Sequence, residues 1–162
     1  MRVWLSNRLT TGFRIADETP REATLAPAGF RELLRRECAR SDRNGHQFAL
    51  VDLTIAAASR KSITHLVDLV WERMRATDSA GWIDEPHRIC ALLFECPEPA
   101  AQRFGAHVAD RMRGLDVTVT FTVYTYPGAL PPALAMLAPA RTRAQAPDGT
   151  APGTDARTPR AT

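Results

Sequence analysis

The stretch RATDSAGWIDEPHRICALLF, residues 75–94, decides the fold of this chain. GWI at 81–83 and RICALLF at 88–94 have the apolar and β-branched content that is typical of strands. Between them, DEPH at 84–87 has turn chemistry, and its proline cannot donate a hydrogen bond to a β-ladder. The stretch therefore predicts a hairpin of two antiparallel strands in the middle of the chain.

Helix and strand patterns lie on both sides of this hairpin. Apolar residues at helical spacing predict helices over 27–45, 61–78 and 97–114, and apolar or alternating runs predict strands over 46–55 and 116–126. The order predicts an α+β fold, a ferredoxin-like βαββαβ antiparallel sheet with helices packed on it, preceded by an N-terminal helix. In this arrangement the two helices of the βαββαβ unit cover one face of the sheet.

The chain has 162 residues, which is enough for one domain with a sizeable core and too few for two ordinary domains. We expect an N-terminal arm at 1–26, a folded domain at 27–127 and a low-complexity tail at 128–162. The tail is rich in Ala, Pro, Thr, Arg and Gly, and such a composition cannot bury enough surface to become ordered.

The composition is that of a soluble protein, with 44% hydrophobic and 24% charged residues. The apolar runs are too short for a membrane span and the start resembles no secretory signal, so we expect a cytoplasmic protein without membrane contact. The tail contributes +2 of the net charge of +3. The folded part is nearly neutral, and the exposed face of the last strand has Tyr124 as its lone aromatic residue. We therefore expect no nucleic-acid partner.

The three cysteines, Cys38, Cys90 and Cys96, have no CxxC spacing. His87 and His107 do not complete a zinc pattern with them. Cys38 falls on the apolar face of a helix and Cys90 inside an apolar strand, where a reduced cysteine acts as a small hydrophobe.

Asp52 is the one charged residue within the apolar strand at 46–55. A carboxylate among Val51, Leu53 and Ile55 is costly to bury without a partner. We therefore expect its side chain to point toward water, a partner group or a metal ion.

Three segments together resemble GGDEF domains, the diguanylate cyclase family. They are FRELLRRECARSDRNGHQFALVDLTI (30–55), LVDLVWERMRATD (66–78) and RICALLFECPEPAAQRFGAHVADRMR (88–113). The first resembles a leading helix, a polar turn and the strand that carries a metal-binding aspartate, here Asp52. The second ends on the family's arginine and aspartate, here Arg75 and Asp78. The resemblance extends over roughly 28–126 and rests on order and spacing.

The resemblance also implies a depleted active site. Active relatives join two magnesium-bound triphosphates by means of acidic residues, and paired glycines allow close approach to the nucleotide. Counted without gaps from Asp78, the GG(D/E)EF position falls on DEPHR at 84–88. Asp84 and Glu85 replace the glycines, and Pro86 and His87 replace the acids. Thr54 stands in place of a second strand aspartate. The implied function is a catalytically inactive regulatory or protein-interaction module in bacterial signalling.

An alternative function is that the chain has kept catalytic activity. Asp52 with Asp84 or Glu85 could converge to hold Mg²⁺, because hard cations prefer clustered carboxylates, and the chain would then be a metal-dependent nucleotidyl cyclase or transferase. The competing interpretation is an acidic turn and no cofactor. Trp82 is expected to pack in the core rather than to stack on a base, and His87 to be a solvated turn residue rather than a general base.

We expect a protein partner, bound at a sheet edge or on the open sheet face. A nucleotide ligand remains a second option. The sequence does not choose the partner or the surface.

Overall fold

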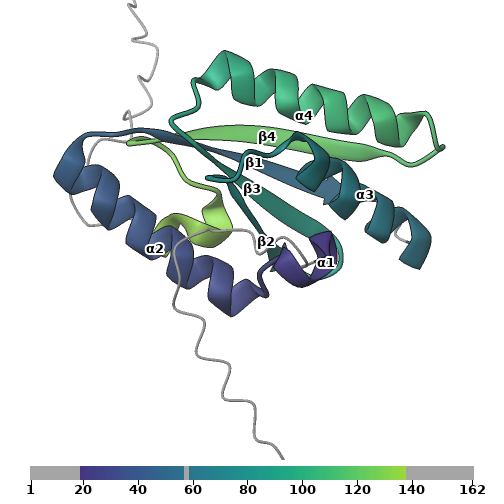
Figure 1. Ribbon diagram of the computed structural model, residues 1–162, viewed down its shortest axis with the longest axis horizontal. Coiled ribbons are helices and arrows are strands. Elements are labelled where there is room, and N and C mark those ends of the chain that lie inside the picture. Colours follow the sequence, from purple (N-terminus) through teal and green to yellow (C-terminus); the bar gives the residue numbers. More distant parts are fainter. Residues whose placement is uncertain (1–18, 57–58, 138–162) are drawn as a thin grey trace, which may run out of the picture.

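The computed structural model describes residues 19–56 and 59–137 (Figure 1). Its elements are α1 (Pro20–Ala23), α2 (Pro27–Asn44), β1 (Phe48–Ile55), α3 (Arg60–Arg73), β2 (Ser79–Asp84), β3 (Arg88–Phe94), α4 (Glu98–Arg113), β4 (Val119–Tyr126) and the 3₁₀ helix η1 (Pro132–Leu137). The predicted helices and strands are confirmed with small shifts at their ends. None of the helices in the described ranges is long and apolar enough to cross a membrane.

The four strands form one sheet in the order β2-β3-β1-β4, and every neighbouring pair is antiparallel. This order interleaves two strand-helix-strand units, so the βαββαβ prediction is confirmed. β1 lies between β3 and β4, and its residue Asp52 is opposite Cys90 on one side and Thr122 on the other. The carboxylate therefore belongs to an inner strand, with a paired strand on each side.

Helices cover both faces of the sheet (Figure 1). α3 and α4, the helices of the βαββαβ unit, pack on one face with Val51, Leu53 and Ile55 of β1. α2 and η1 pack on the other face with Phe48 and Leu50. Successive strand residues point to opposite faces, so the unbroken apolar run of β1 supplies both cores.

α2 approaches the sheet closely at Gly81 of β2. A Cβ atom at position 81 would lie 2.5 Å from the Cβ atom and ring of Phe30, so only glycine leaves room for this side chain. Phe30, Leu34 and Cys38 form the buried face of the helix. The helix ends at Gly45, whose positive φ of 74° suits a residue without a side chain.

Residues 19–26, the end of the predicted N-terminal arm, are attached to the sheet. Leu25 forms a parallel bridge to Gly81: its N–H donates to Ala80 O at 3.0 Å, and its carbonyl accepts from Trp82 N at 2.9 Å. The rest of the arm, 1–18, lies outside the described residues.

The first residues of the predicted tail also pack. Leu130 and Leu134 are buried beside α2, and η1 extends the cover over this face. Residues 138–162 lie outside the described part of the chain. The boundary predicted at 127 therefore does not coincide with the end of packed structure.

Candidate functional site

The candidate site is centred on Asp52, on the sheet face that α2 and η1 partly cover. Its side chain is only 5% exposed. The neighbouring β1 residues on this face are the buried Leu50 and the exposed Thr54. The carboxylate thus lies where the apolar core gives way to the open end of the sheet.

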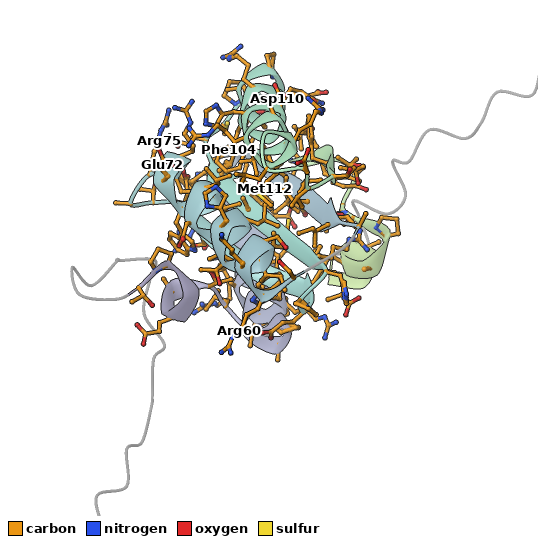
Figure 2. The ribbon with its side chains drawn as sticks, turned by 90° about the vertical axis from the view of Figure 1, so that its right-hand side faces the viewer. Arg60, Glu72, Arg75, Phe104, Asp110 and Met112 are labelled. Carbon is orange, nitrogen blue, oxygen red and sulfur yellow. The ribbon has the colours of Figure 1, made fainter. Side chains whose placement is uncertain are left out.

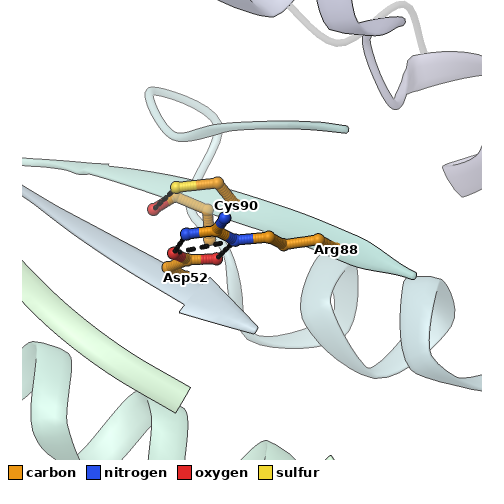
Figure 3. A network of polar contacts seen from close by, with 4 residues as sticks. Asp52, Arg88 and Cys90 are labelled. Carbon is orange, nitrogen blue, oxygen red and sulfur yellow. Dashed lines mark hydrogen bonds and ion pairs between the residues drawn. The ribbon is translucent and has the colours of Figure 1, made fainter. Parts of the chain in front are cut away.

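Arg88, the first residue of β3, holds this carboxylate (Figure 3). Its Nε donates to Asp52 Oδ1 at 2.9 Å and its terminal Nη2 to Oδ2 at 2.5 Å. The hydrogen bond with Asp52 raises the pKa of Arg88 above its ordinary value. Such two-point guanidinium–carboxylate pairing is strong and directional. In the structure the Asp52 side chain thus meets a partner group, which is one of the three surroundings expected for it.

The other two predicted metal ligands lie at the hairpin. Asp84 is the last residue of β2 and is opposite Arg88 in the ladder, and Glu85 follows in the turn. Both side chains are exposed. Because β3 lies between β1 and β2, the Cα atoms of Asp52 and Asp84 are separated by two strand spacings, about 10 Å or more.

The structure does not present these carboxylates to one ion. Within 19–56 and 59–137, no three His, Cys, Asp or Glu side chains are grouped so that they could hold a metal. Both oxygens of Asp52 already accept hydrogen bonds from Arg88, and a cation would have to displace this guanidinium. The arrangement shown does not fit a bound Mg²⁺, and metal binding by Asp52, Asp84 and Glu85 stays a prediction.

Trp82 and His87 lie where the conservative interpretations placed them. Trp82 is buried in the core beneath α3 and α4. His87 is exposed in the turn, where its backbone N–H donates to Asp84 O at 2.9 Å and its carbonyl accepts from Ile55 N at 3.0 Å. His87 thus joins the hairpin to the end of β1 through its backbone.

Two of the three thiols are buried, as predicted. Burial, with help from Asp42, raises the pKa of Cys38 to about 12, and burial raises that of Cys90 well above its ordinary value. A thiol that keeps its proton is a poor nucleophile and a poor metal ligand. Cys38 and Cys90 therefore act as core residues.

Asp78 organises the turn that precedes β2. Its Oδ2 accepts from Arg75 N at 2.8 Å and its Oδ1 accepts from Phe94 N at 3.0 Å. The side chain is buried. This carboxylate fastens the end of the α3 segment to the end of β3.

The same end of the molecule carries two exposed arginines. Burial and the carboxylate of Asp78 raise the pKa of the Cys96 thiol, and the guanidinium groups of Arg75 and Arg103 act in the opposite direction. Both arginines therefore lie within electrostatic reach of Cys96. Arg75 points outward on the side where α4 lies (Figure 2). Because Arg75 follows α3 and Arg103 lies in α4, no spacing in the sequence indicates that both act on Cys96.

No family model matches the chain, and no curated protein matches it either. Solved structures do. A DGC protein from Thermotoga maritima aligns with 67% of this chain and 86% of its own, at a TM-score of 0.57 and 13% identity. The GGDEF domain of DgcB from Caulobacter crescentus, solved in complex with c-di-GMP, aligns with 69% of this chain and 78% of its own. Its TM-score is 0.57 and its sequence identity is 12%.

A further microbial GGDEF domain, solved with cyclic di-GMP, aligns with 67% of this chain and 74% of its own, at a TM-score of 0.55 and 15% identity. At these identities the likeness is one of fold. The chain has the α+β fold of GGDEF domains, and the resemblance found in the sequence is confirmed at that level.

Proposed function

We propose that this chain is a catalytically inactive GGDEF-like domain, acting in the cytoplasm as a regulatory or protein-interaction module of bacterial signalling. The observation that supports this most directly is the pairing of Asp52 with Arg88. In the resembled family this aspartate holds a metal ion. Here a side-chain cation of the same molecule neutralises it.

The hairpin supports the same conclusion. Paired glycines let a nucleotide approach the backbone because they carry no side chains. At the corresponding positions this chain carries Asp84 and Glu85, whose side chains are both exposed at the turn. A triphosphate approaching here would meet two carboxylates, and like charges close together repel.

The decisive experiment incubates the purified full chain with GTP and Mg²⁺ or Mn²⁺ and separates the nucleotides by chromatography. We expect no cyclic dinucleotide, while an active diguanylate cyclase run in parallel forms product. Formation of the dinucleotide by this chain would refute the proposal.

The alternative of a divergent metal-dependent nucleotidyl transferase has its own test. Mn²⁺ binding is measured by calorimetry for the unaltered chain, for Asp52→Asn and for the double variant Asp84→Asn, Glu85→Gln. The control is Asp110→Asn, an exposed carboxylate on α4. Binding that both site variants lose and the control keeps would favour this alternative. We expect no such pattern.

A nucleotide ligand is a second candidate function for the inactive domain. Two of the structures that share this fold were solved with c-di-GMP. On this chain, Arg75 and Arg103 offer two exposed guanidinium groups that both lie within electrostatic reach of Cys96, and guanidinium groups bind phosphates well.

Calorimetric titration with c-di-GMP tests this candidate. We expect binding that weakens at least about tenfold in Arg75→Ala and in Arg103→Ala, since each removes a charged hydrogen-bond donor worth about 1.5–3 kcal/mol. Arg31→Ala, which removes an exposed arginine from α2, is the matched control and should bind like the unaltered chain. Absence of binding, or equal loss in all three variants, contradicts it.

A further inference from the structure

The outer edge of β4 is unpaired in the described part of the chain. β4 is the last strand in the order β2-β3-β1-β4, and its ladder is with β1. A strand at the edge of a sheet presents a row of free backbone donors and acceptors. This edge is therefore a template on which another strand can pair.

The register shows which backbone groups face outward. Ala56 N donates to Thr118 O at 3.3 Å, which continues the β1–β4 ladder in register. In an antiparallel ladder, hydrogen-bonded pairs alternate with non-hydrogen-bonded pairs. The even-numbered residues of β4 thus bond to β1, and the N–H and C=O groups of Val119, Phe121 and Val123 point away from the sheet.

The two edge strands of this sheet, β2 and β4, differ in how far they are protected against pairing with another strand. The β2 edge is covered where Leu25 bonds on both sides of Gly81, and its ladder is interrupted by a bulge between Trp82 and Asp84. Among residues 19–56 and 59–137, β4 has neither a covering segment nor a bulge, and Val119–Tyr126 contains no charge and no proline. Proteins commonly protect a free edge with charges, prolines, bulges or a covering segment.

Apolar side chains accompany this edge. Phe121 and Val123 point toward the core layer of α4 but remain only half-buried. Gly105 of α4 lies so close to the ring of Phe121 that a Cβ there would be 2.3 Å away, which fixes the ring in place. Leu115, in the turn just before β4, is 52% exposed and is the one large hydrophobic side chain exposed among the described residues.

We propose that β4 pairs antiparallel with β4 of a second copy of this chain, about a two-fold axis, to form one continuous eight-stranded sheet. About such an axis, the odd-numbered residues of one β4 lie opposite the odd-numbered residues of the other. The outward N–H and C=O groups of the two strands can then form hydrogen bonds with each other. Phe121 then lies opposite Val123 or Phe121 of the second copy, and aromatic cross-strand pairs stabilise sheets.

The chemistry of the strand favours its own copy as the occupant. An uncharged strand does not repel itself and carries no charge that would select an oppositely charged peptide. Pairing with a second copy also covers the β4 edge of each copy, whereas a partner with a single strand would cover the β4 edge of one copy and leave its own outer edge free. The inference goes beyond the proposed function and does not depend on it, because it rests on the outward backbone groups of β4 and not on the charge or the partners of Asp52.

Thr122→Lys tests the edge. Thr122 is exposed and its backbone N–H faces β1, so the substitution leaves the fold of one copy intact. Thr122 lies on the proposed axis or one residue from it, so the two lysines would be directly opposite or diagonal to one another, and like charges at these positions weaken strand pairing. Thr54→Lys is the matched control, because Thr54 is exposed on the same face but belongs to the inner strand β1.

Sedimentation equilibrium of the full chain in reducing buffer measures the association. We expect a dimer that Thr122→Lys weakens about tenfold or more, that Thr54→Lys leaves unchanged, and that forms again when Thr122→Lys is mixed with Thr122→Glu. A chain that is monomeric throughout overturns the proposal. A dimer that Thr122→Lys weakens no more than Thr54→Lys overturns it as well.

Discussion

Arg88 holds the carboxylate of Asp52 from the neighbouring strand, two residues along from the Cys90 that lies directly opposite. Cross-strand diagonal neighbours are within reach of a long side chain. Asp52 is almost fully buried, while the Arg88 side chain is 29% exposed. The pair is therefore anchored at the aspartate and open to solvent at the arginine.

Arg88→Met should destabilise the fold by about 3 kcal/mol, because it leaves a buried carboxylate without its cation. The double variant Asp52→Leu, Arg88→Met should recover most of this loss, since it replaces the pair with apolar groups. Urea unfolding followed by circular dichroism measures both. If the single variant unfolds like the unaltered chain, Asp52 is better solvated than its burial indicates.

Gly81→Ala should destabilise the fold by about 1–3 kcal/mol, because its Cβ would lie 2.5 Å from Phe30 and α2 would have to move away from β2. Gly29→Ala provides the comparison within α2. A Cβ there meets Leu25 at an ordinary 3.8 Å, so the change should be neutral or stabilising by up to about 1 kcal/mol. Thermal unfolding of both variants checks the difference in sign.

Asp78→Ala should cost about 2 kcal/mol, since the backbone N–H groups of Arg75 and Phe94 lose their acceptor. Asp78→Asn keeps one acceptor oxygen and should cost about half as much. Asp68→Ala, at an exposed position of α3, should change the free energy of unfolding by less than about 0.5 kcal/mol. Equal effects at the two positions would contradict the role assigned to Asp78.

The buried thiols should make stability fall at alkaline pH. The pKa of Cys38 rises from 9.0 to about 12 on folding, so between these values the folded chain keeps a proton that the unfolded chain has lost. The stabilisation is fully present below pH 9 and is lost as the pH rises toward 12. Cys38→Ala should flatten this part of a plot of thermal midpoint against pH. An unchanged slope in the variant would show that Cys38 does not contribute.

The sequence predicts most of the framework because local patterns report local structure. The alternation of residues 116–126 assigns the faces of β4 correctly, with Val119 toward the core and Thr120 and Thr122 exposed. Asn44-Gly45 marks the end of α2. These features depend on neighbouring residues only.

What the sequence missed depends on register and tertiary packing. Asp52 attracted attention as a buried charge, but Arg88 was not predicted as its partner, because the pairing follows from the alignment of β1 with β3. The packing of Leu130 and Leu134 depends on the path of the chain after β4. That Arg75 and Arg103 both lie within electrostatic reach of Cys96 likewise appears only after folding.

Leu25 is bonded to the strand that ends at the hairpin turn, and it comes only six residues after the first described residue. A displacement at Thr19 would reach β2 through the two backbone hydrogen bonds of Leu25 and would reach α3 through the hydrogen bond that Trp71 donates to Thr24. The position of residues 19–26 is thus coupled through the backbone to the strand that leads into the turn at Glu85.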